Sequence, residues 1–174
     1  MRYLLIIFLL AWVSFRVHGQ QTQSLLITGE VNAEKTVSLE EIKTLPVQKL
    51  GDLLITNHAG EPRGTARDLM GIPIRELLKD LSYNTSSPRE LSEFYFVFEA
   101  IDGYKVVFSW NELFNNPLGN SVYLIVSREG KKVEEMEDGL LLVCLSDEKT
   151  GRRQVKNLSR IVIHRASPSK RPSR

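Results

Sequence analysis

A β-hairpin pattern lies near the middle of the chain. Two apolar segments rich in aromatic and β-branched residues, Phe94 to Ile101 and Lys105 to Ser109, flank the dipeptide Asp102-Gly103. Asp-Gly between two such segments is typical of a two-residue hairpin turn, because both residues tolerate the backbone angles that the turn requires. The pattern therefore predicts antiparallel β structure in the middle of the domain.

The rest of the chain consists of short apolar runs separated by turn residues and a few helix starts. Ser38 and Ser109 are each followed three residues later by Glu, which predicts a capping box at the start of a helix. A third helix is expected after Pro73, because Pro suits the first helical position. We therefore predict one β-rich α+β domain with mixed sheets, about eight strands and about three short helices. Besides the hairpin, the expected strands are 24–31, 50–57, 65–70, 122–127, 140–146 and 158–164.

The length and composition are those of an ordinary globular protein. The chain has 174 residues, of which 42% are hydrophobic and 25% charged, and this size suits one domain. Such a composition excludes a disordered chain, a collagen-like repeat and a disulfide-dense scaffold. The single cysteine, Cys144, cannot form an internal disulfide and falls in an apolar run that predicts a buried strand.

The first 19 residues have the pattern of a signal peptide. Arg2 precedes a nearly unbroken apolar run over 4–15, and Val17-His18-Gly19 places small residues before a cleavage point at Gln20. The run is about 12 residues long, short of the roughly 20 that span a membrane as a helix, so no permanent anchor is expected. We therefore expect a secreted or periplasmic protein with a domain over 20–164.

Charge is unevenly distributed along the mature chain. Removing the leader takes away Arg2 and Arg16 and leaves equal numbers of acidic and basic residues. The tail 165–174 carries four basic and no acidic residues, so the body 20–164 has an acidic excess of four. The tail is rich in Ser, Pro and Arg and is expected to be disordered. Because the body lacks a basic stripe, a nucleic-acid partner is not expected.

Few residues have the pattern of a functional site. His58 follows an apolar strand and opens a turn-rich loop, which favours either a binding group or a solvated turn. Trp110 is either the aromatic wall of a site or the anchor of a short helix. Arg152 and Arg153 follow the turn Thr150-Gly151 and are interpreted as solvated charge, with ligand contact as the alternative.

The order of these segments resembles a known family, the oxidoreductase molybdopterin-binding domain of sulfite oxidases and related periplasmic proteins. The resemblance covers nearly all of the chain after the leader and implies the sulfite oxidase type of fold. The segments that carry it are LLITGEVNAEKTVSLEEIKTLP, GIPIRELLKDL, EAIDGYKVVFSWNEL and EDGLLLVCLSDEKTGRRQVKNLSRIVI.

The chain departs from this family at the metal-binding loop. Enzymes of the family ligate molybdenum through a Cys in the loop that corresponds to Asn57 to Gly64, and here that loop reads NHAGEPRG. Neither His nor Asn reproduces the charge and softness of a thiolate. We therefore expect a non-catalytic relative without catalytic residues or metal ligands, so that molybdopterin is a less favoured ligand than a metal-free pterin.

The resemblance implies a pocket for a pterin, a flat bicyclic ring that needs an apolar or aromatic wall and a few fixed polar groups. The expected function is that of a secreted protein that binds a pterin or a similar heteroaromatic molecule. Two alternatives stay open: an interaction or sensing module for a membrane receptor or another protein partner, with a vestigial pocket, and a molybdenum cofactor-dependent oxidoreductase. The candidate ligand-binding residues, taken from the matched loops, are Asn57, His58, Arg63, Arg67, Asp102, Tyr104 and Trp110.

Overall fold

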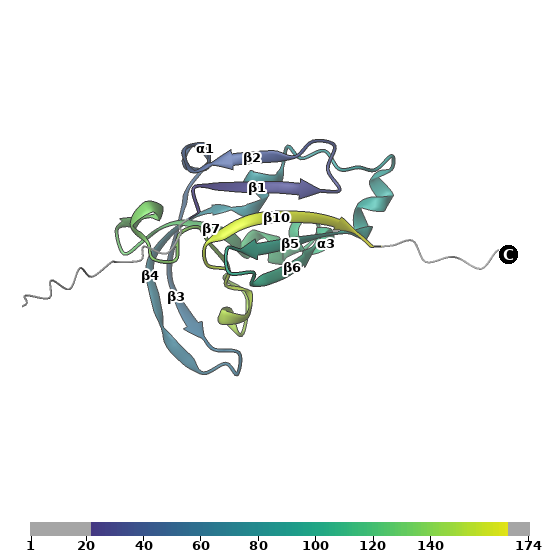
Figure 1. Cartoon of the computed structure of the whole chain (residues 1–174). Helices are drawn as coiled ribbons and strands as arrows, with labels where there is room; N and C mark the ends of the chain where they lie inside the picture. Colours follow the sequence, from purple (N-terminus) through teal and green to yellow (C-terminus); the bar gives the residue numbers. More distant parts are fainter. Residues whose placement is uncertain (1–21, 167–174) are drawn as a thin grey trace, which may run out of the picture.

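The computed structural model describes residues 22–166. The expected signal peptide and residues 167–174 of the expected tail lie outside this range. The described part forms two five-stranded sheets that share one large apolar core. The prediction of a single β-rich α+β domain is confirmed (Figure 1).

The first sheet joins the two ends of the domain. Its strand order is β2-β1-β10-β5-β6, in which β1 and β10 are parallel and the other neighbours are antiparallel. The predicted hairpin forms its edge, with Glu99 of β5 opposite Lys105 of β6. The prediction of a two-residue turn is wrong, because the Ala100 N–H donates to the Tyr104 carbonyl across a longer turn in which Gly103, but not Asp102, has a positive φ. The strands are β1 (Ser24–Gly29), β2 (Lys35–Ser38), β5 (Phe94–Ala100), β6 (Lys105–Ser109) and β10 (Leu158–Arg165).

The second sheet is built around β7, which pairs with β4 and with both β8 and β9. Because β7 is covered on both faces, its sequence is a continuous apolar run rather than an alternating one. The β3–β4 hairpin is long and curved (Figure 1), and the end of β3 lies against residues 150–153. The strands are β3 (Gln48–Thr56), β4 (Pro62–Pro73), β7 (Val122–Arg128), β8 (Lys131–Lys132) and β9 (Leu141–Cys144).

The core follows the alternation of the strands. Phe94, Phe96 and Phe98 of β5 point inward and are fully buried, while the residues between them are half-buried. In β7, Leu124 packs into the large core and Ile125 into a smaller cluster on the other face of the second sheet. The second sheet is therefore buried on both of its faces along β7.

The helices are short and begin where the sequence predicts. Ser38 and Ser109 both form capping boxes, in which the serine hydroxyl accepts from the third helical N–H and the glutamate accepts from the serine N–H. No helix of residues 22–166 is long and apolar enough to cross a membrane. The helices are α1 (Leu39–Lys43), α2 (Ile74–Leu78) and α3 (Trp110–Phe114), with the 3-10 turns η1 (Pro88–Glu93), η2 (Pro117–Ser121), η3 (Val133–Glu135) and η4 (Thr150–Arg153).

Two strands and the four 3-10 turns were not expected. β2 has a single buried residue, Val37, and β8 is only two lysines long, so neither shows an apolar pattern in the sequence. β10 runs one residue further than expected, because Arg165 pairs with Phe94 of β5 in the sheet. Its guanidinium also contacts the carboxylates of Glu90 and Glu93 of η1. Arg165 therefore belongs to the folded domain.

Candidate functional site

The tip of the β3–β4 hairpin is shaped by Asn57. Its side-chain oxygen accepts from the backbone N–H groups of Ala59 and Glu61, both at 2.9 Å, and its amide nitrogen donates to the Glu61 carboxylate at 2.8 Å. This use of an Asn side chain fixes a turn without regular secondary structure. The neighbouring His58 side chain is exposed at the tip.

The 3-10 turn η4 holds this tip in place. The Thr150 hydroxyl donates to the Leu54 carbonyl at 2.7 Å and accepts from the Thr56 N–H at 3.0 Å. Gly151 lies so close to the hairpin that an added Cβ would come within 2.1 Å of the Thr56 carbonyl oxygen. Arg152 then donates from Nε to the His58 carbonyl at 3.2 Å.

The β5–β6 turn meets η4 from the other side. Asp102 accepts from the Tyr104 N–H at 3.0 Å, as its turn position predicts, and the Tyr104 hydroxyl donates to the Arg152 carbonyl at 2.6 Å. Tyr104 as a whole residue remains 44% exposed. Three segments that are far apart in the sequence are thus joined by hydrogen bonds at Arg152.

Two adjoining clefts lie along this junction. The first, which we call the turn cleft, has a volume of about 260 Å³ and is lined by Ala100, Asp102, Tyr104, Gly151, Gln154 and Lys156. The second, the hairpin cleft, has a volume of about 410 Å³ and is lined by Ile55, Arg63, Gly64, Thr65, Ala66, Arg128, Glu129, Asp138, Gln154 and Lys156. Because Gln154 and Lys156 line both clefts, the two are neighbours.

The seven candidate residues fall into three groups. Arg63, Asp102 and Tyr104 line the two clefts, and Asn57 and His58 lie at the hairpin tip that contacts η4. Arg67 and Trp110 line neither cleft.

Arg67 and Trp110 lie outside the two clefts, in different surroundings. Arg67 is exposed in the middle of β4, and its carbonyl accepts from the Glu129 N–H at 3.2 Å. The Trp110 ring is half-buried and packs on Phe114, with ring centroids 5.4 Å apart. Beside Trp110, burial raises the pKa of Tyr83 to about 12, and the indole opposes the increase. Trp110 therefore has the surroundings of a helix anchor.

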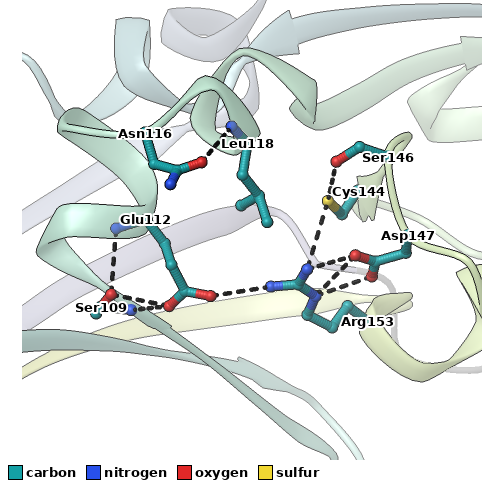
Figure 2. A network of polar contacts seen from close by, with 8 residues as sticks. All are labelled: Ser109, Glu112, Asn116, Leu118, Cys144, Ser146, Asp147 and Arg153. Carbon is teal, nitrogen blue, oxygen red and sulfur yellow. Dashed lines mark hydrogen bonds and ion pairs between the residues drawn. The ribbon is translucent and has the colours of Figure 1, made fainter.

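The most densely connected side chain near η4 is Arg153, and Figure 2 shows its contacts. Its Nε donates to Asp147 at 2.8 Å and its Nη2 to the other carboxylate oxygen of Asp147. Its Nη1 lies 3.4 Å from Glu112, and its guanidinium carbon lies 4.5 Å from the centre of the Phe108 ring. We call Arg153, Asp147 and Glu112 the closed cluster.

The interpretation of Arg153 as solvated charge is wrong, since its side chain is only 22% exposed. Hydrogen bonding to Asp147 raises its pKa above the usual range, so the side chain stays charged. A local pattern in the sequence did not reveal this role, because Glu112 lies about forty residues away in the chain. Arg152, by contrast, is exposed as expected.

The residues present do not fit a molybdenum–thiolate centre at the hairpin tip. The single cysteine, Cys144, is 1% exposed on β9, 3.5 Å from the Ser146 hydroxyl and 3.9 Å from Arg153. Burial raises the pKa of its thiol, which disfavours the thiolate that a metal needs. Residues 22–166 contain no group of three or more His, Cys, Asp or Glu side chains placed to hold a metal.

A larger cavity lies elsewhere, between α1, β4, β7 and η3. It has a volume of about 630 Å³ and is lined by Lys43, Val47, Met70, Val126, Ser127, Gly130, Lys132, Glu134 and Glu135. None of the seven candidate residues lines it, so it is separate from the junction at η4.

Comparisons with known proteins support the fold. No family model matches the chain, and no curated protein matches it in sequence. Among solved structures, it is similar to a chain of the sulfane dehydrogenase SoxCD from Paracoccus pantotrophus, with a TM-score of 0.61 and 16% sequence identity. The match covers 83% of this chain and 38% of that chain, so this protein spans well under half of its neighbour's length. Residues 22–166 therefore have a sulfite oxidase-like fold, as the resemblance in sequence implied.

Proposed function

We propose that this protein is secreted and binds a pterin or a similar heteroaromatic molecule, without catalysis, at the junction around η4. The observation that supports this proposal best is the pair of hydrogen bonds that joins the hairpin tip and the β5–β6 turn to Arg152. Because the walls of the two clefts are already linked, little ordering is needed when a ligand binds.

The turn cleft offers the groups that a flat polar ring requires. The Tyr104 ring is exposed enough to stack on a heteroaromatic face, and its hydroxyl is held by Arg152. Gln154 supplies an amide donor and acceptor, and Lys156 supplies a charged donor for ring carbonyl oxygens. Non-catalytic binding agrees with the burial of Cys144, which leaves the hairpin tip without a thiol.

The direct test is a titration of the mature chain, residues 20–174, with biopterin, monitored by fluorescence quenching and by calorimetry. We expect saturable binding, and we expect Tyr104→Ala to weaken it by about tenfold, or about 1.4 kcal/mol. Tyr95→Ala is the matched control, because Tyr95 lies on the outer face of β5 and stacks on His164 instead. Equal affinities of the two variants, or an absence of binding by the wild type, would contradict the proposal.

A second measurement addresses the natural ligand. Protein purified from its native secretory compartment is analysed for metals, and the acid-released ligand is identified by fluorescence and mass spectrometry. A fluorescent pterin without metal is the expected result. Molybdenum in stoichiometric amount would overturn the non-catalytic assignment.

A further inference from the structure

β6 is an edge strand of the first sheet. It pairs with β5 on one side, and no strand within residues 22–166 pairs with its other side (Figure 1). Its buried residues, Val106 and Phe108, face the core, whereas Val107 lies on the opposite face of the sheet and is 53% exposed. An unprotected strand edge is a template for pairing with another chain.

The outer side of β6 presents unpaired backbone groups. In an antiparallel pair, hydrogen-bonded residues alternate with residues whose N–H and C=O groups point away from the partner strand. The hydrogen bond from the Ala100 N–H to the Tyr104 carbonyl sets this alternation, so Val106 is bonded to β5. Lys105 and Val107 therefore direct their N–H and C=O groups outward, and these four groups have no partner within residues 22–166.

β6 is less protected from pairing than the other edge strands of the described part. Proline, a bulge, a charge or a covering segment commonly protects a sheet edge. The pairing of β3 is irregular and its end is bonded to Thr150 of η4, β2 begins with the exposed Lys35, and β8 consists of two lysines. β6 has no proline and pairs with β5 without a bulge. Its one charged residue, Lys105, lies 2.9 Å from the carboxylate of Glu99 on β5, so this charge is balanced within the chain.

We infer that β6 pairs antiparallel with β6 of a second copy of this chain, so that two five-stranded sheets join into one. The register that uses all the unpaired groups places Lys105 opposite Val107 of the second copy. The N–H and C=O of Lys105 then bond to the C=O and N–H of that Val107, and the two-fold axis repeats both bonds. The register with Val107 opposite Val107 is less favourable, because it needs the Ser109 N–H, which already donates to Glu112 at 2.7 Å.

The charges on β6 favour a second copy as the occupant of this edge. No two like charges are directly opposite, since each Lys105 faces an apolar Val107 and stays paired with Glu99 of its own chain. The aliphatic part of Lys105 covers the exposed Val107 side chain. Because few side chains take part, the interface is small, and we expect a reversible dimer. This inference goes beyond the proposed function, because the pairing requires no ligand.

Sedimentation equilibrium of the mature chain over a range of concentrations tests the pairing. We expect a monomer–dimer equilibrium whose dissociation constant rises at least about tenfold in Val107→Lys, because the new cation lies opposite Lys105. Val107→Glu is expected to tighten the dimer by about threefold, because its carboxylate faces the same lysine. The matched control is Leu54→Lys, with an expected change of less than about twofold, because Leu54 is 51% exposed but lies on β3.

Amide hydrogen exchange tests the register. The Lys105 and Val107 amides are expected to become protected as the protein concentration rises, whereas the Val106 amide, which is bonded to β5, is protected at every concentration. A wild type that stays monomeric at every concentration overturns the inference and leaves this edge to a different chain. The inference also fails if a folded Val107→Lys dimerises as tightly as Leu54→Lys, if Val107→Glu weakens the dimer as much as Val107→Lys does, or if the Lys105 and Val107 amides stay unprotected in the dimer.

Discussion

The closed cluster and a second cluster pair arginine with aspartate in different ways. The second, which we call the open cluster, consists of Arg128, Asp138 and Lys156. In the closed cluster, Arg153 binds Asp147 through two nitrogens, reaches Glu112 with a third, and lies over the Phe108 ring. In the open cluster, Arg128 binds Asp138 through one nitrogen only. The two arginines therefore differ in the number of guanidinium nitrogens that contact a carboxylate, which is three in Arg153 and one in Arg128.

The surroundings of the two clusters explain their geometry. Arg153 connects η4 to α3 and β9, so its contacts hold three elements together (Figure 2). Arg128 stands at the end of β7 and shares its carboxylate with Lys156, which turns Asp138 toward two cations at once. Each oxygen of Asp138 contacts one cation, so Arg128 receives one carboxylate oxygen where Arg153 receives two.

The largest effect is expected when the closed cluster is broken. Arg153→Met removes the partner of Asp147, whose side chain is only 11% exposed, and leaves a carboxylate in a poorly solvated place. We expect a loss of about 2 kcal/mol in the free energy of unfolding, measured by urea denaturation. Arg128→Met is expected to cost about 1 kcal/mol, because Asp138 keeps Lys156 as a partner.

A double variant sharpens this test. In Arg153→Met with Asp147→Leu, the unpaired carboxylate is also removed, so part of the lost stability is expected to return. If Arg128→Met costs as much as Arg153→Met, the distinction between a closed and an open cluster is wrong.

Local patterns predict much of this fold. The hairpin at Asp102-Gly103 and the capping boxes at Ser38 and Ser109 are found where the sequence places them, because the interactions that form them lie within a few residues. β2 and β8 were missed, because each is defined by pairing with a neighbour rather than by its own apolar residues. The parallel pairing of β1 and β10 likewise depends on contact between two segments, which here lie at opposite ends of the domain.

The site was harder to predict than the fold. The matched loops gave Arg63, Asp102 and Tyr104, which do line the two clefts at η4. Arg128 and Asp138 were missed, because their contact and their place opposite Arg63 depend on how β4, β7 and the segment before β10 pack. A basic residue at the end of a buried strand is a weak signal that the sequence alone does not separate from solvated charge.

The second prediction concerns the pH dependence of the open cluster. Because the folded-state pKa of Asp138 is lowered, its ionisation stabilises the fold above the pKa of the unfolded chain, and this contribution is lost as the pH falls through the folded-state value. We expect Asp138→Asn to be less stable than the wild type by about 1 kcal/mol at pH 7. The difference is expected to shrink below about pH 4, where the carboxylate of the unfolded chain begins to take up a proton, and to be lost once the pH falls below the lowered folded-state pKa.

Thermal or urea unfolding at several pH values measures this change. Asp52→Asn is a suitable control, because Asp52 is exposed and receives a single backbone hydrogen bond from Asp68. A stability difference for Asp138→Asn that stays constant from neutral pH to about pH 3 would show that the charge of Asp138 does not hold the open cluster together.

The smallest expected effect isolates one contact of the closed cluster. Glu112 caps α3 by accepting from the Ser109 N–H at 2.7 Å, and its other oxygen lies 3.4 Å from Arg153. Glu41 forms the same capping box on α1 but has no arginine partner, so Glu41→Gln measures the cost of neutralising the cap alone. We expect Glu112→Gln to exceed Glu41→Gln by less than about 0.5 kcal/mol in urea denaturation, because Glu112 is 40% exposed and the contact is long. A larger difference would mean that Glu112, and not only Asp147, holds Arg153 over the Phe108 ring, and the closed cluster would then depend on α3 as much as on β9.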